Sequence, residues 1–530
     1  MNPTSRHRSA IIASWVIFGI FLLLWLFPGL LNLIMSTKNY DLRIGLWASE
    51  WVGFSKFSAF WQSGDGSRAF ANSFSLTLWG FLGAFVLGSA ASYFVPRIRE
   101  RKLRFFALAL LLVPVFIPGV CWVTGVLPRI QANHASVRWR YMMMEILMLA
   151  SVTGFAGAVF GMVMPGRGFF TGLSWTVVLL VFLCLSPDFN ILHLLQSSDV
   201  RMDTMDAYAY RLGLLQGNYS SGAMIQQLKS LLQLLLGSVA CIGVYIVFLR
   251  NRNSPFDSVV REQTSIPFSL WALPAAIFAI VIAILFAPTL YLHSFAGGLW
   301  EQLPMQLVSS ALTFLIALVF SWAVIHVLRT MHIIWFTVCA GLLLAASNPL
   351  LGSVLFYTQL GWMRTVFPGV LTALFEPRCL LLLVLCARVS SASHLREQSI
   401  WWIALVPACL AAAHYWSDVL SPFLYLGNQK WIPFGSLLYM QQTSSLGADA
   451  LTYFVNLLPC LGFLALSVFA LSRYVDIERT PARALPPEHN KFSQDVVKNH
   501  HKYIGNQIGG GSLPPEELDG ELVEEEREPE

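Results

Sequence analysis

Charged residues are scarce in this sequence, and that scarcity decides the class of protein. Of its 530 residues, only 12% are Asp, Glu, Lys or Arg, against about 25% in soluble proteins. Hydrophobic residues make up 56% of the chain and the mean hydropathy is +0.62, so a soluble fold is excluded. The net charge of +5 is small for this length and gives no indication of nucleic-acid binding.

Patterns typical of enzymes and metal sites are also missing. The sequence has no nucleophile elbow, Walker phosphate loop, H-E-x-x-H helix or paired-carboxylate pattern. Its eight cysteines form neither a C-x-x-C pair nor a metal-ligand spacing with histidine, and they lie in or beside apolar stretches, as small buried side chains do. We therefore predict that the protein is not an enzyme and has no cofactor or metal.

Long hydrophobic stretches are what the sequence has in abundance. A helix of about 20 apolar residues crosses the roughly 30 Å hydrocarbon core of a bilayer. Twelve such stretches lie near residues 11–35, 71–95, 104–126, 142–164, 169–186, 229–249, 267–292, 305–328, 333–357, 366–387, 399–418 and 451–472. The first is too long for a removed signal peptide. The sequence predicts an all-α polytopic membrane protein with about 12 transmembrane helices.

Basic turns predict how the chain lies across the membrane. The N-terminus, the loop PRIRERKLR at 96–104 and the loop RNRN at 250–253 are rich in Lys and Arg, which favour the cytoplasm. Both termini are then cytoplasmic, with loops 36–70, 187–228 and 419–450 on the far side. The loop 127–140, which carries three arginines on the predicted outer side, is an exception.

The C-terminal segment differs in composition from the rest of the chain. It runs through PARALPPEHN and a GGG run to EELDGELVEEEREPE. Such a sequence cannot bury a core. We predict a disordered acidic cytoplasmic tail at 476–530, and a docking tail for a basic partner is the alternative.

Two parts of the sequence resemble each other. Residues 73–99 and 309–329 both contain Leu-Thr, continue through small residues and end in Arg. The next span of each half contains proline, at Pro114 and Pro118 and at Pro349. Proline frees a backbone carbonyl, which a bundle interior or a cavity can satisfy. These three prolines are therefore candidates for a translocation path. The repeat predicts two tandem halves of six helices each, at 1–260 and 261–475.

Ionisable residues inside spans indicate a transport path or a partner, because they are costly in lipid. Glu145 lies near the outer end of the predicted span 142–164, and Glu376 lies with Arg378 in the span 366–387. Glu145 and Glu376 are candidates for the translocation path. Glu376 could instead pair with Arg378 or mark a helix break before Pro377, and Glu145 could pair with a nearby arginine.

Three further polar residues, His326, His414 and Asp418, lie close to predicted membrane faces. Such positions favour interfacial polar side chains over a proton relay.

Several segments together resemble a known family. The opening FANSFSLTLWGFLGAFVLGSAASYFVPRIRERKLRFFALALLLVPVFIPG at 70–119 has an F-x-N-S start, a small-residue helix ending in a basic turn and a P-x-x-I-P helix. The segments at 186–195, 206–236 and 418–458 are similar to the ends of the two halves of fused permeases. Over residues 10–475 the chain resembles the permeases of binding-protein-dependent ABC importers, of the fused iron(III)/thiamine type.

This resemblance implies a protein of the inner membrane that works with lipid, two ATPase subunits and a periplasmic solute-binding protein. It also implies two cytoplasmic coupling segments. The first corresponds to MLASVTGFAGAVFGMVMP, which keeps Gly154 and ends at Pro165, and the second runs from Arg388 to Pro407. Both have lost the Glu-Ala-Ala motif of the family. A diverged structural subunit of another membrane complex and an ion-coupled secondary transporter therefore stay open as alternatives.

Overall fold

The computed structural model describes residues 3–98, 100–117, 119, 121, 134–163, 181–182, 203–250, 299–345, 349–392, 397–419, 424, 433–436, 438 and 450–479. All of these residues belong to the unit Met1–Arg479. Of them, 87% are helical. The sheet that they contain pairs β1 (Lys38–Asn39) with β2 (Glu50–Trp51) in antiparallel register, Lys38 opposite Trp51. The predicted all-α class is confirmed.

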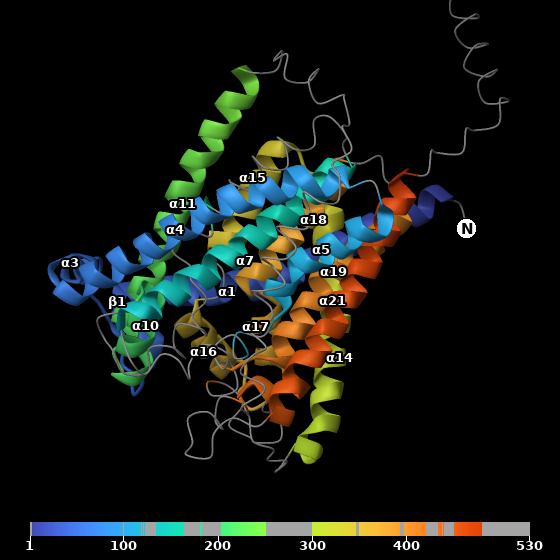
Figure 1. Cartoon of the computed structure of the whole chain (residues 1–530). Helices are drawn as coiled ribbons and strands as arrows, with labels where there is room; N and C mark the ends of the chain where they lie inside the picture. Colours follow the sequence, from blue (N-terminus) through green and yellow to red (C-terminus); the bar gives the residue numbers. More distant parts are fainter. Residues whose placement is uncertain are drawn as a thin grey trace, which may run out of the picture. The chain divides into compact units, whose positions relative to one another are not determined.

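Long apolar helices alternate with short ones along the chain (Figure 1). In chain order they are α1 (Pro3–Thr37), α2 (Gly45–Ala48), α3 (Ser55–Gln62), α4 (Gly64–Phe94), the 3-10 helix η1 (Val95–Arg97), α5 (Arg101–Phe116), α7 (His134–Val163), α10 (Met205–Tyr210), the π-helix η4 (Arg211–Leu215), α11 (Tyr219–Arg250), α14 (Leu299–Thr330), α15 (Ile333–Ala345), α16 (Leu350–Gln359), α17 (Phe367–Leu374), α18 (Pro377–Ala392), α19 (Glu397–Trp416) and α21 (Ala450–Arg479).

Five described helices, α1, α4, α11, α14 and α21, are long and apolar enough to cross a bilayer. Two bent pairs, α15 with α16 and α17 with α18, raise the number to seven if each pair is one span. The polytopic class is confirmed. The count of twelve stays a prediction, because the expected spans at 169–186 and 267–292 lie outside the described residues, apart from 181–182. Of the predicted tail at 476–530, residues 476–479 belong to helix α21, so the helix runs further than expected, and the residues from 480 onward lie outside the described ones.

Continuous helices at the periphery present apolar side chains to their surroundings. On α1 the exposed row includes Val16, Ile20 and Leu23, and on α11 it includes Leu235 and Val239. Residues three or four apart lie on one face of a helix. Each of these helices therefore has an apolar outer face that suits lipid, because the helix satisfies its own backbone hydrogen bonds.

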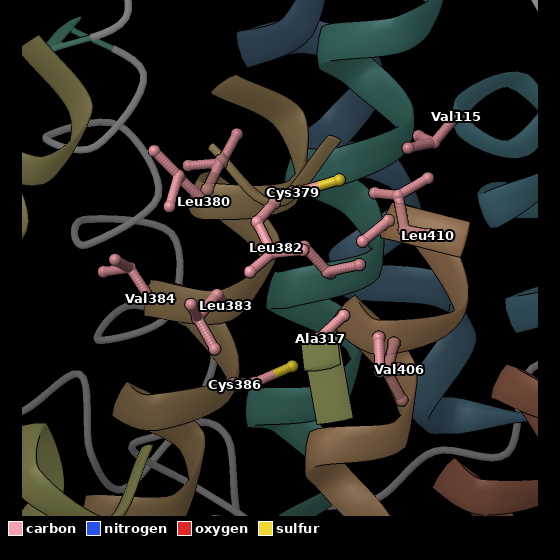
Figure 2. Close-up of a cluster of buried hydrophobic side chains, with 14 of the residues drawn as sticks. Val115, Ala317, Cys379, Leu380, Leu382, Leu383, Val384, Cys386, Val406 and Leu410 are labelled. Carbon is pink, nitrogen blue, oxygen red and sulfur yellow. The ribbon is translucent and has the colours of Figure 1, made fainter. Parts of the chain in front are cut away.

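Helix α18 lies at the centre of the described core. It contacts α7, α14, α15, α17 and α19. Figure 2 shows Cys379, Leu382 and Cys386 of α18 among Ala317 of α14 and Leu410 of α19. Since α7 falls in the first predicted half and α18 in the second, the two halves pack directly on each other. The internal duplication itself stays a prediction.

Glycines let α4 and α7 approach closely. A Cβ atom at Gly88 of α4 would lie 2.6 Å from the Cβ and Cγ2 atoms of Thr153 of α7, and a Cβ atom at Gly154 would lie 2.7 Å from Ala91 Cβ. Such contacts are shorter than real Cβ atoms allow. Association of helices in membranes depends on small residues that permit this approach.

We therefore expect Gly88→Ala to destabilise the protein by about 1–3 kcal/mol, the usual cost of overpacking. The matched control is Gly243→Ala in α11, where a Cβ atom meets nothing within 4 Å. There alanine should be neutral or stabilising, because it is the better helix former. Thermal unfolding of both variants in detergent measures the difference. Equal melting temperatures for the two variants would contradict the close α4–α7 contact.

Candidate functional site

The span made of α17 and α18 is broken at Glu376. The two helices meet at a bend of 52°, and Pro377 is the first residue of α18. Proline suits this position, because the first helical N–H needs no partner within the helix. The carboxylate of Glu376 accepts a hydrogen bond from the backbone N–H of Cys379 at 3.0 Å. Glu376 thus caps the N-terminus of α18, where a negative charge is stabilised by the helix dipole.

Arg378 neutralises this carboxylate. Its Nε atom lies 2.6 Å from Glu376 Oε1, and the two side chains are only 17% and 12% exposed. The sequence-based alternative for Glu376, an ion pair at a helix break, is what the structure contains. Its role in a translocation path stays a prediction.

The same arginine reaches the first half of the chain. Arg378 Nη1 lies 3.9 Å from the Sδ atom of Met148 in α7, and Met148 is buried. Glu145, another predicted path residue, lies three positions earlier in α7. The side chain of Glu145 is not among those that the structure describes, so its partner stays open. The backbone of Glu145 therefore lies in the same part of α7 as Met148, the residue that Arg378 contacts.

A second broken span lies at Pro349. There α15 and α16 meet at 85°, and Pro349 is the residue before the first turn of α16. The backbone N–H of Leu351 in that turn donates to Gln226 Oε1 of α11 at 3.4 Å. A side chain of α11 thus accepts a hydrogen bond from a backbone N–H group at the start of α16, which has no partner within its own helix.

Short side chains surround the start of α16. Cβ atoms at Gly213 and Gly222 would each lie 2.7 Å from Leu351 Cδ1, and a Cβ atom at Gly352 would collide with the backbone oxygen of Pro28 in α1. These glycines allow α16 to enter between α1 and α11. The positions of these glycines in the sequence do not predict the close packing of α16, because the glycines lie in separate segments.

Buried amides of α1 and α11 are functional candidates that sequence reasoning missed. Gln226 and Gln233 lie on α11 and are 7% and 0% exposed, and Asn32 of α1 is 0% exposed. Asn32 Nδ2 donates to the backbone oxygen of Ala223 at 3.1 Å. The available signal was the seven-residue spacing of Gln226 and Gln233, which places both on one helix face.

The other predicted site residues lie within helices or outside the described residues. Pro114 is buried in α5, which ends two residues later at Phe116. Gly154 lies inside α7 against α4, and Pro407 lies inside α19. Pro118 and Pro165 lie outside the described residues.

Arg388 is in α18, with its guanidinium 6.0 Å from the ring centre of Phe336 in α15. Both predicted coupling segments therefore include helical residues of the packed core. Their role in coupling stays a prediction.

Polar residues near the helix ends are more buried than expected. His326 is 2% exposed, and its Nδ1 atom lies 3.1 Å from Ser14 Oγ, which joins α14 to α1. Asp418, after the end of α19, is also 2% exposed. His326 therefore forms a contact between helices, and the interfacial position of His326, His414 and Asp418 stays a prediction.

The described fold, with its continuous outer helices and its two broken inner spans, is that of a polytopic α-helical membrane protein. No family model matches the chain. Over 272 residues the sequence is 24% identical to Protein LplB of Bacillus subtilis (strain 168), a region that covers 41% of this chain and 86% of LplB. The similarity supports an ABC-type permease and gives no support to the iron(III)/thiamine type. Together with the apolar helices, it indicates a multi-pass protein of the plasma membrane.

The Glu376–Arg378 pair predicts non-additive mutations. Glu376→Gln and Arg378→Gln should each destabilise the protein by about 3 kcal/mol, because each leaves a mostly buried charge without its partner. The double variant should be no less stable than either single variant. Thermal unfolding in detergent of the two single variants and the double variant measures this coupling.

The exposed pair Asp65–Arg68, with a 3.1 Å contact and side chains about half exposed, is the matched control. Asp65→Asn and Arg68→Gln should each cost no more than about 1 kcal/mol and should be additive. Additive losses at Glu376 and Arg378 would show that the two charges do not stabilise each other.

Proposed function

We propose that the chain is the transmembrane permease subunit of an ABC-type importer. It moves a small solute or metal ion across the inner membrane with energy from separate ATPase subunits. The observation that carries the proposal is the similarity to LplB, which extends over 86% of that protein and supports an ABC-type permease.

The lengths of the two proteins favour a fused arrangement. Nearly all of LplB aligns with 41% of this chain. A chain built from two permease halves in tandem would give this proportion, with one half matched and the other diverged. Halves at 1–260 and 261–475 are our proposal for that arrangement.

The broken spans suit a translocation path. Discontinuous helices in transporters place unpaired backbone groups and helix ends near a solute at mid-membrane depth. Here the breaks at Pro349 and Glu376 supply helix ends, and buried Gln226 supplies a neutral amide group at the first break. Glu376 and Arg378 form a neutral pair at the second. We assign the path to the interior that these groups line.

The proposal includes the partners that such a permease needs. Two ATPase subunits bind on the cytoplasmic side, where both termini lie, and a periplasmic solute-binding protein binds on the other side. We propose that the ATPases contact the chain just after the C-terminal ends of α7 and α18, beyond Val163 and Ala392. In this arrangement the buried helical parts of both segments transmit the motion of the ATPases to the core.

Site-specific photo-crosslinking tests the coupling. A benzophenone amino acid at Gly166 or Arg396, just beyond α7 and α18, should crosslink to an ATP-binding subunit in native membranes. Mass spectrometry identifies the product. The same amino acid at Ser58, an exposed residue of α3, should give no such product, because it lies in the predicted far-side loop 36–70.

Purified complex in proteoliposomes gives the second measurement. Uptake should require ATP and should stop with vanadate. The importer proposal fails if the full chain shows no crosslink to an ATPase and its transport follows an ion gradient without ATP. That result would favour a secondary transporter, and a stable complex without transport would favour a structural subunit.

A further inference from the structure

The segment between the first two long helices exposes large aromatic side chains. It contains β1, α2, β2 and α3, and the exposed fractions of Trp47, Trp51, Phe54 and Trp61 are 71%, 65%, 72% and 46%. Four exposed aromatic residues within fifteen positions are more than a water-facing loop needs. Tryptophan in particular favours the interface between lipid and water, because its ring is apolar and its N–H is polar.

Backbone hydrogen bonds hold the first part of the segment at the C-terminal end of α1. The backbone N–H groups of Val52 and Gly53 both donate to the backbone oxygen of Thr37, at 3.0 and 2.9 Å. Thr37 is the last residue of the first membrane span. Trp51, opposite Lys38 in the β-hairpin, and Phe54 are therefore fixed close to the end of that span.

The second part is held at the N-terminal end of α4. Ser63 follows α3 directly, and its Oγ atom accepts a hydrogen bond from the backbone N–H of Gly66 at 3.0 Å, which caps α4. Trp61 thus lies three positions before the start of the next membrane span at Gly64. The start of α4 fixes the position of Trp61 relative to the membrane. The end of α1 fixes the position of Trp51 in the same way.

Aromatic contacts join α3 to the apolar face of α4. The rings of Trp61 and Phe70 meet edge to face at 5.1 Å between centroids, and those of Phe70 and Phe74 are stacked at 6.2 Å. Phe74 begins an exposed apolar row that continues through Leu78 and Leu82. The exposed face of α3 is therefore continuous with a face of α4 that suits lipid.

Two of the three basic residues of the segment donate hydrogen bonds to its own backbone, and the third, Arg43, is exposed. Lys38 Nζ donates to the backbone oxygens of Leu46 and Trp47 at 3.1 and 2.9 Å, and Lys56 Nζ donates to the backbone oxygen of Lys38 at 3.3 Å. Burial lowers the pKa of Lys56. With three basic and two acidic residues between positions 38 and 62, the segment has no strongly basic surface for anionic headgroups.

We propose that residues 38–62 are a membrane anchor that lies in the interfacial region of one leaflet, with Trp47, Trp51, Phe54 and Trp61 among the lipid headgroups and upper acyl chains. The partner is the phospholipid bilayer itself, and the binding is apolar, as for other interfacial segments rich in aromatic residues. The anchor fixes the outer ends of α1 and α4 at one depth. A solute-binding protein then docks on other loops of this side.

Depth-resolved fluorescence quenching tests the anchor in the full chain. An environment-sensitive fluorescent amino acid is placed singly at Trp47, Trp51 or Trp61, and the protein is reconstituted in phosphatidylcholine vesicles. A nitroxide near the lipid carbonyls should quench these sites several-fold more than a nitroxide deep in the acyl chains. High salt should leave the quenching unchanged, because apolar contacts are not screened.

Two control positions define the scale. The same amino acid at Leu82, on the exposed face of α4, should be quenched best by the deep nitroxide. At Gln216, an exposed residue after η4, iodide in the water should quench strongly and neither lipid nitroxide should.

The anchor proposal is overturned if Trp47, Trp51 and Trp61 behave as Gln216 does. Protection of these sites from iodide by added periplasmic extract would then assign the surface to a soluble partner. The measurement needs no ATPase and no cargo. It therefore fails or succeeds independently of the proposed import function.

Discussion

The fold depends on one constraint, that a helix end inside a bilayer needs a hydrogen-bonding partner supplied by the protein. The helices with exposed apolar faces, such as α1, α4 and α11, run without a break through their spans. The two breaks occur where protein surrounds the chain. At one, Glu376 accepts the N–H of Cys379, and at the other, Gln226 accepts the N–H of Leu351. At each break, therefore, a polar side chain satisfies a backbone group that the break releases.

The same constraint joins the two predicted halves. Gln226 belongs to the first half and Leu351 to the second, and Arg378 of the second half reaches Met148 of the first. Helix α1 packs on α11 of its own half and on α14 and α16 of the other. The predicted boundary near residue 260 therefore separates two stretches of sequence, but the residues on either side of it pack into one core. Neither half could fold alone without exposing these groups to lipid.

Hydropathy predicted the long helices well, because the ability of a helix to cross a bilayer depends on the composition of one continuous stretch of sequence. The stretches 11–35, 229–249, 305–328 and 451–472 fall within α1, α11, α14 and α21, and the stretch 71–95 lies in α4 except for its last residue, which begins η1. The break at Glu376 was also visible, since a charge pair beside proline is unusual in a span. Packing was not visible. Gly154 was assigned to a coupling motif by its spacing, whereas its contact with Ala91 depends on a helix about sixty residues away.

The two breaks differ in how they are joined to the neighbouring helices. At Glu376 the cap and the ion pair join residues two and three positions apart, so both travel with α18 as a unit. A shift of α18 would change the contact of Arg378 with Met148, the approach of the Arg388 guanidinium to Phe336 of α15, and apolar packing. At Leu351 the partner is 125 residues away on α11, so a shift of α16 separates the pair and leaves a buried N–H unsatisfied, at a cost of about 1–3 kcal/mol. The cap and the ion pair at Glu376 therefore do not tie α18 to another helix, whereas the bond between Leu351 and Gln226 ties α16 to α11. A movement of α18 against α7 would therefore keep the Glu376–Arg378 pair together.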